Sequence, residues 1–192
     1  MEQDEIPAKE ALLIEWRDHK EGRDLEIELI IEDQNWGDLS SDFSFLKEAS
    51  LLALCQGAIK SAPLAMKSPH RLAVLVMSND ASIRDLNKSY RGKDKATNVL
   101  SFPSTENLLP GEELEPVHIG DVVLAFEYVT KEAKNEKKPI KSHLSHLVIH
   151  GVLHLLGYDH ETSEDAEIME TLEIKLMKQL GLENPYEGEP VV

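Results

Sequence analysis

Residues 140–156 read IKSHLSHLVIHGVLHLL, a run that is apolar on nearly every side except a face of histidines. A surface helix has one apolar stripe and one polar face, whereas a helix that is apolar almost all round belongs in the core. The segment therefore predicts a central buried helix. Leu156 and Gly157 can end it, because glycine readily takes the left-handed conformation of a helix C-terminus.

Three histidines in and after this helix have the spacing of metal ligands. His150 and His154 lie four residues apart, so both imidazoles project from the same helical face. A chain reversal at Gly157 can bring His160 back to the same ion. Three protein ligands leave the fourth tetrahedral position open, which is typical of a catalytic zinc site. The sequence therefore predicts one zinc ion (Zn2+) per chain.

Gly151 argues against the most familiar chemistry of such a site. Zinc peptidases with the pattern HExxHxxGxxH space their histidines and glycine identically, and the glutamate after the first histidine is their general base. Glycine can neither accept a proton nor orient a water molecule. A zinc peptidase is therefore a disfavoured alternative.

Two more histidines precede the motif by one and two helical turns. His143 and His146 fall on nearly the same face as the predicted ligands. They line the approach to the metal in one interpretation and form an ordinary polar helix face in another. The sequence does not distinguish the two.

Length and composition predict a single soluble domain. The chain has 192 residues, enough for one full core, and 41% of them are apolar and 29% charged. Its apolar runs are far shorter than a membrane span, and its first five residues are acidic where a secretory signal would be basic. The single cysteine, Cys55, excludes an internal disulfide and suits a reducing compartment. We therefore expect a cytoplasmic protein with no membrane and no disulfide partner.

The net charge of −16 by itself argues against a nucleic-acid partner, but its distribution reverses that inference. Residues 51–105 carry 8 basic against 3 acidic side chains, and residues 131–141 carry 5 against 2. The segments 1–50, 106–130 and 142–192 are all acidic. Residues 51–105 and 131–141 are both candidate phosphate-binding surfaces, although the lysines of residues 131–141 could equally solvate a helix face.

Hydrophobic periodicity predicts strands and helices that alternate along the chain. The expected strands cover residues 25–31, 71–77, 98–102 and 117–124. The expected helices cover residues 42–60, 82–90, 125–134, 140–156 and 163–180. The connection between the last two strands is too short for a crossover helix, so at least one strand pair is antiparallel. We predict a single α+β domain with a mixed, mostly parallel sheet that has one antiparallel strand and is packed by helices.

The domain boundaries follow from the same patterns. Residues 1–22 are charged and lack a sustained apolar pattern, so we expect a loosely ordered or partly helical extension. The functional domain then spans residues 23–185, and residues 186–192 form a C-terminal tail.

Three motifs together resemble one known family. The histidine motif at residues 150–160, the run YRGKDKATNVLSFP at residues 90–103 and IGDV at residues 119–122 resemble the YbeY family of bacterial metal-dependent endoribonucleases. The resemblance extends in order over residues 25–185. It implies a cytoplasmic enzyme that cleaves single-stranded RNA, matures the 3′ end of 16S ribosomal RNA at the small ribosomal subunit and helps in ribosome quality control.

The resemblance also implies roles for individual residues. Position by position, His150, His154 and His160 match the zinc ligands of the family, and Arg91 matches an essential arginine that faces the metal cleft. We therefore expect His150 and Arg91 to be catalytic. A guanidinium stays protonated and binds phosphate in bidentate fashion, although a surface salt bridge is the alternative role for Arg91.

Further RNA contacts are expected beside Arg91. Lys93 and Lys95, and Lys88 as a further candidate, can hold flanking phosphates by charge alone, which would make RNA affinity dependent on salt. Unpaired bases usually stack on aromatic side chains, and Tyr90, Phe102 and Tyr158 are nearby candidates. Burial is the alternative role for Phe102.

The proton-transfer step and one alternative function stay open. Zinc can lower the pKa of a bound water or polarise a phosphate oxygen, and the 2′-hydroxyl of RNA can itself be the nucleophile. Asp121, Asp159 and Glu161 are candidate bases, although Asp159 is better suited to orient a histidine. A ribosome-assembly binding factor with a structural metal would share every motif.

Overall fold

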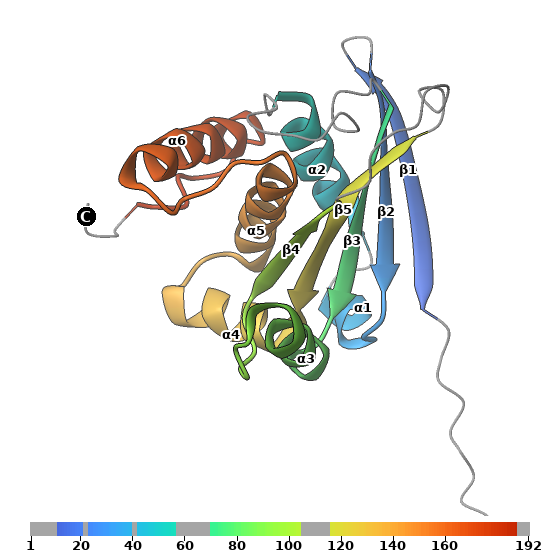
Figure 1. Ribbon diagram of the computed structural model, residues 1–192, viewed down its shortest axis with the longest axis vertical. Helices are drawn as coiled ribbons and strands as arrows, with labels where there is room; N and C mark the ends of the chain where they lie inside the picture. The colour runs from blue at the N-terminus through green and yellow to red at the C-terminus, as the bar shows by residue number, and fades with distance from the viewer. Residues whose placement is uncertain (1–10, 21–22, 40–41, 57–69, 105–115, 188–192) are drawn as a thin grey trace, which may run out of the picture.

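A five-stranded sheet forms the centre of the computed structural model, which describes residues 11–20, 23–39, 42–56, 70–104 and 116–187 (Figure 1). The strand order is β1-β2-β3-β5-β4. The strands span Leu12–Lys20 (β1), Arg23–Ile31 (β2), His70–Ser78 (β3), Val99–Pro103 (β4) and Val117–Ala125 (β5). β2, β3 and β5 run parallel, and β4 is antiparallel to β5. The predicted mixed, mostly parallel sheet is confirmed.

Helices cover both faces of this sheet. They span Asn35–Leu39 (α1), Ser44–Gln56 (α2), Asp80–Arg91 (α3), Phe126–Glu136 (α4), Ile140–Leu155 (α5) and Ser163–Gln179 (α6). α2 and α5 pack on one face, which we call the inner face, and α6 packs outside them (Figure 1). α3 lies on the opposite, outer face (Figure 1).

α5 is the central buried helix that the sequence predicts. Ten of its sixteen residues are buried, and its leucines, valines and isoleucines join the inward side chains of β2, β3, β5 and α2 in the main core. The helix ends where the sequence indicates, because Gly157 takes a positive φ of 85° and the N–H of Tyr158 donates to the carbonyl of Leu153. This turn redirects the chain toward His160.

Gly151 marks a very close approach of α5 to the sheet. A Cβ at this position would lie 2.5 Å from Cγ1 of Val122 in β5 and 3.2 Å from Oγ of Ser101 in β4. The Ser101 hydroxyl also donates to the carbonyl of Gly151 at 3.1 Å. Residue 151 therefore faces the sheet, and the packing leaves no room there for a side chain.

The prediction of a loosely ordered extension is wrong for residues 12–20. These residues form β1, which pairs antiparallel with β2 from Leu12↔Ile31 to Lys20↔Arg23 and adds a second antiparallel strand to the one expected. Only one face of an antiparallel edge strand meets the core, so a few apolar side chains are enough to pack such a strand against it. Ile14 and Trp16 pack there, and the charges around them concealed the strand pattern.

The remaining sequence predictions agree with the structure where it describes them. The other strands and the helices lie within a few residues of their expected positions, while α1 was not predicted. Residues 57–60 of the helix expected at residues 42–60, residues 1–10 and residues 188–192 lie outside the described residues. The domain boundaries at 23 and 185 remain predictions. No helix in the described ranges has the length and apolarity needed to cross a membrane.

Candidate metal centre

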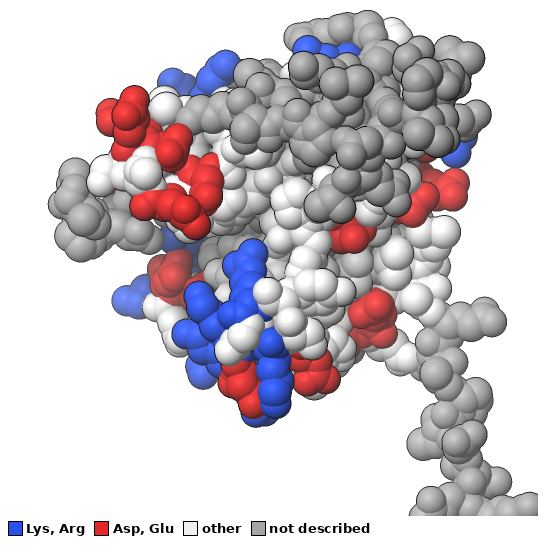
Figure 2. Space-filling view, in the orientation of Figure 1, with Lys and Arg blue, Asp and Glu red and all other residues white. Residues whose placement is uncertain are grey.

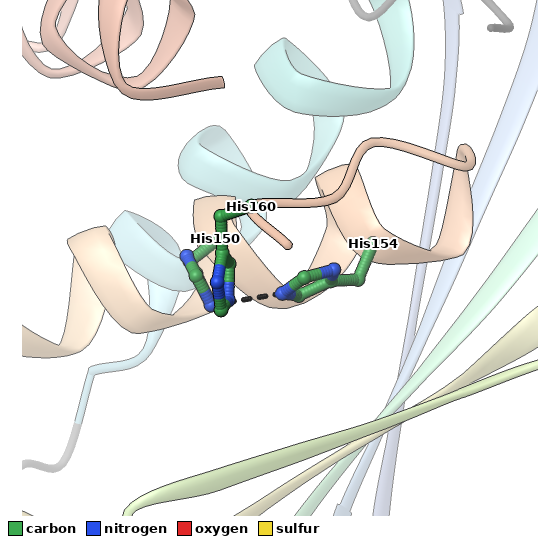
Figure 3. Close-up of side chains that lie close together, drawn as sticks. All are labelled: His150, His154 and His160. Atoms are coloured by element: carbon green, nitrogen blue, oxygen red, sulfur yellow. Dashed lines mark hydrogen bonds between the residues drawn. The ribbon is translucent and has the colours of Figure 1, made fainter. Parts of the chain in front are cut away.

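Three histidine side chains converge beside α5. Figure 3 shows His150 and His154 projecting from the helix and His160 reaching back to them from the segment that follows. Their ligand atoms all lie within 4.8 Å of one another, and the Nε2 atoms of His150 and His154 are 3.0 Å apart. Tetrahedral zinc bound at ~2.0–2.1 Å places its ligand nitrogens about 3.3 Å apart. The cluster can therefore hold one metal ion.

The other ring nitrogens of two ligands are held by oxygen acceptors. Nδ1 of His154 lies 2.9 Å from the carbonyl oxygen of Tyr158, and Nδ1 of His150 lies 2.8 Å from Oε1 of Glu173. A carbonyl or a carboxylate only accepts hydrogen bonds, so both Nδ1 atoms carry a proton and a neutral ring has its lone pair on Nε2. Burial, together with the neighbouring His150, lowers the pKa of His154 to about 4. Two facing lone pairs repel unless a cation lies between them, so the donor set fits zinc.

Glu173 of α6 is the carboxylate that orients His150. It is fully buried, and besides His150 it accepts hydrogen bonds from Nε2 of His146 at 3.0 Å and from the hydroxyl of Tyr186. Burial alone would raise the pKa of Glu173, but the hydrogen bonds from His146 and His150 outweigh it and lower the pKa to about 2. A carboxylate held against a ligand imidazole fixes the ring and makes its metal-binding nitrogen more basic.

The two earlier histidines of α5 support the site and lie outside the ligand cluster. His146 donates to Glu173 and packs edge-on against Tyr186, with ring centroids 5.3 Å apart. His143 is buried one turn earlier, where its Nε2 lies 2.8 Å from a carboxylate oxygen of Glu132. Both histidines therefore tie α5 to neighbouring helices.

The predicted RNA-binding residues are exposed cations that are not members of the three-histidine cluster. Arg91 is the last residue of α3, and Lys93 and Lys95 follow in the connection to β4, all of them exposed. Within the described ranges none of the three forms an ion pair, and no hydrogen bond or ring contact joins them to the histidine cluster. Figure 2 shows basic side chains gathered over α3 and this connection. We call residues 91–95 the basic segment.

The basic segment is fastened to α3. Gly92 ends the helix with a φ of 67°, and the buried Asn87 donates its amide to the carbonyl of Lys95 at 2.7 Å. Asp94 accepts from Arg84 at 2.6 Å and from Lys88 at 3.0 Å, and these two hydrogen bonds lower its pKa. The exposed cations are therefore presented on an ordered turn.

A second set of hydrogen bonds ties the end of this connection to α5. Asn98 donates its amide to Oε2 of Glu132 at 2.9 Å, and the same oxygen pairs with His143. Burial alone would raise the pKa of Glu132, but the hydrogen bonds from His143 and Asn98 lower it. The chain carrying the basic segment and the helix carrying the ligands thus share one polar network.

Comparison with known proteins places these features in a family. The family model described as Endoribonuclease YbeY matches residues 38–181. The chain belongs to the YbeY family. A protein of Rhizobium etli (strain CIAT 652) named Endoribonuclease YbeY is 42% identical over 174 residues, which cover 86% of this chain and 95% of that protein. One of the same name from Chelativorans sp. (strain BNC1) is 44% identical over 140 residues, 72% of this chain and 85% of its own.

A solved structure is also similar to the chain. The solution structure of a Thermotoga maritima protein covers 86% of this chain and 99% of its own length, with 22% sequence identity and a TM-score of 0.49. The predicted membership in the YbeY family is confirmed by the family model and the sequence relatives.

Sequence reasoning missed two groups that orient the ligands. Glu173 lies on the α6 face that also carries the buried Met169, Leu176 and Met177. A carboxylate in an apolar helix stripe is a signal that could have identified it. The carbonyl of Tyr158 gives no signal, because every residue has one.

The acidic residues that the sequence singled out have other positions. Oδ1 of Asp159 accepts the backbone N–H of His160 at 2.7 Å, so Asp159 supports the third ligand through its main chain. Asp121 pairs with His118 at 2.9 Å on β5, and Glu161 is exposed. The carboxylate that orients a ligand ring is Glu173.

Proposed function

We propose that the protein is a zinc-dependent endoribonuclease that cleaves single-stranded RNA. The observation that carries this proposal is the pair of Nε2 atoms of His150 and His154, 3.0 Å apart and completed by His160. Membership in the YbeY family supports the reaction class, because its relatives bear the name Endoribonuclease. We further propose that it acts in the cytoplasm on precursor 16S ribosomal RNA of the small ribosomal subunit, in 3′-end maturation and ribosome quality control.

Each group of residues in the site would have a separate role in phosphodiester cleavage. His150, His154 and His160 would hold the ion, which when bound can lower the pKa of a water or polarise a phosphate oxygen. Glu173 keeps the His150 ring in place by accepting a hydrogen bond from the Nδ1–H of that ring. Arg91 would bind the phosphoryl oxygens on which negative charge builds up, and Lys93 and Lys95 would hold flanking phosphates.

The exposure of these three cations supports their assignment to RNA. Asp94 is already engaged by Arg84 and Lys88, so the neighbouring Arg91, Lys93 and Lys95 keep their charges available for phosphate. The hydrogen bonds of Asn98 and Glu132 hold their chain segment near α5. A peptidase is not supported, because residue 151 faces the sheet.

The proposal is tested by cleavage of a single-stranded RNA with purified wild type, His150→Ala and Arg91→Ala. We expect both variants to lose at least about 100-fold in rate, since one loses a ligand and the other a charge contact in the transition state. Equal cleavage by all three proteins would mean that a contaminating nuclease is responsible.

A ribosome-assembly binding factor with a structural metal is the second candidate. It is favoured by the connection of the ligands to the buried Glu173, because a bound ion would brace α5, α6 and the segment of His160. Chelation separates the two functions. Loss of the circular-dichroism signal on chelation would indicate a structural ion, whereas an intact fold without cleavage would indicate a catalytic one.

A further inference from the structure

A cleft of about 530 Å³ lies between α3 and the outer face of the sheet. Val76 of β3, Val123 of β5 and Phe102 of β4 line it along the sheet, and Leu86 and Tyr90 line it along α3. Its volume falls within the ~300–1,000 Å³ of small-molecule sites. The metal centre belongs to α5 on the inner face, so this cleft is a separate feature.

An exposed aromatic ring stands at the rim of the cleft. Tyr90 is 71% exposed. Its ring packs edge-on against Phe102, with centroids 5.1 Å apart and an interplanar angle of 65°. A ring that is supported at its edge and open to solvent is a typical platform for an unpaired nucleic-acid base.

The polar part of the lining consists of hydroxyls and carboxylates. These groups are Glu32, Ser78, Ser82, Asp85, Ser89 and Asp121. None of the described residues that line the cleft is basic, so a phosphate would be repelled there. Carboxylates instead accept hydrogen bonds from the exocyclic amino groups of cytosine and adenine, which uracil lacks.

Two of these carboxylates are already fixed in place. Glu32 accepts from the hydroxyl of the buried Ser78 at 2.8 Å, and Asp121 pairs with His118 at 2.9 Å. Each keeps further lone pairs for a ligand, since an ionised carboxylate has about four acceptor sites. The polar lining is therefore preorganised to accept hydrogen bonds.

The cleft adjoins the basic segment. Tyr90 directly precedes Arg91, so an RNA strand whose phosphate is bound at Arg91 passes the rim of the cleft. We propose that the cleft binds an unpaired base of the RNA substrate, stacked on Tyr90 and selected for an exocyclic amino group by the carboxylates. This inference rests on the proposed endoribonuclease function, because it adds a base-binding site to that substrate surface.

Free nucleosides test the site without any cleavage step. Cytidine and uridine are titrated into the isotope-labelled, metal-loaded protein while backbone amide resonances are followed by NMR. We expect saturable shifts in α3 and β4 with cytidine and affinity about tenfold weaker for uridine. Tyr90→Ala should weaken cytidine binding about tenfold, the scale of one lost base stack. Tyr90→Phe should retain it, because the aromatic face remains.

Matched variants separate the two parts of the proposal. Asp85→Ala should reduce the preference for cytidine over uridine. Both nucleosides should keep the part of their affinity that comes from stacking on Tyr90. Tyr128→Ala removes another exposed tyrosine, on α4 and outside the cleft, and should change nothing. Shifts of equal size in Tyr90→Ala and wild type, or no shifts in the cleft, would overturn the base site. Equal affinity for both nucleosides would overturn the selection of an amino group.

The nucleoside result is independent of the proposed function. If cytidine binds the cleft while wild type cleaves no RNA, the endoribonuclease proposal fails and the base site stands. If RNA is cleaved at the histidine cluster and cytidine does not bind, the base site alone fails.

Discussion

At the scale of single residues, the metal centre depends on a carboxylate far away in the sequence. Glu173→Gln keeps the size of the side chain but removes the negative charge of the group that accepts the hydrogen bond from Nδ1–H of His150. We expect zinc affinity to fall by roughly 10- to 100-fold, as is usual when the partner of a ligand is changed. Competition with a chromophoric chelator measures the affinity.

The control for this variant is Glu170→Gln, which removes one charge from the exposed side of the same helix. Its zinc affinity should equal that of wild type, and circular dichroism should show both variants folded. An unchanged affinity in Glu173→Gln would show that Glu173 does not orient the ligand.

Gly151 gives a second prediction at this scale. In Gly151→Ala the new Cβ would lie 2.5 Å from Val122, so α5 or the sheet must shift. Overpacking of this kind costs about 1–3 kcal/mol in the free energy of unfolding, which denaturant titration measures. Gly37→Ala in α1 is the matched control, because a Cβ there meets nothing within 4 Å. It should raise stability slightly, by at most about 1 kcal/mol, since alanine is a better helix former than glycine.

The individual ligands could be predicted from sequence, whereas their supports could not. The spacing of His150, His154 and His160 specifies geometry along one helix and one turn, which are local features. Glu173 reaches His150 only because α6 packs on α5, and the carbonyl of Tyr158 depends on how the chain turns after Gly157. Such contacts require the tertiary structure.

At the scale of secondary-structure elements, the network between the β4 connection and α5 predicts a pH dependence. The pKa of Glu132 is lowered in the folded protein, so its contribution to stability is present above the ordinary glutamate value of about 4.3 and is lost as the pH falls through the lower folded value. Glu132→Gln should therefore lose less stability than wild type on acidification through this range. Thermal unfolding at a series of pH values measures the difference.

The control is Glu136→Gln on the exposed side of α4. The stability of this variant should depend on pH as the stability of wild type does in the same acidic range, apart from the small effect of removing a surface charge. If stability falls equally with pH in wild type and in Glu132→Gln, the network does not depend on the charge of Glu132.

The elements themselves differ in how well the sequence predicts them. α5 is unmistakable because a long apolar run with histidines on one face has few alternatives. β1 was missed because an edge strand needs only Ile14 and Trp16 against the core. The backbone at Gly120 is a second feature that the sequence does not predict. Its φ is 139°, and a Cβ there would lie 2.3 Å from the carbonyl oxygen of Phe102. The irregular strand pairing beside it depends on the neighbouring strands, which the local sequence does not reveal.

At the scale of the whole molecule, opposite charges gather in different places. Figure 2 shows acidic side chains over α6 and basic side chains over α3 and the basic segment. The net charge of −16 therefore coexists with a local surface suited to phosphate. RNA approaching the protein would be directed toward α3 and away from α6.

We propose that one zinc ion at the three histidines is required for RNA cleavage. Zinc content and cleavage of single-stranded RNA are measured on the same samples of wild type and His154→Ala. We predict about one zinc per chain and cleavage in wild type, and loss of both in the variant. Undiminished cleavage by zinc-free protein would contradict a role for zinc in cleavage, and full zinc content in His154→Ala would contradict zinc binding at the three histidines.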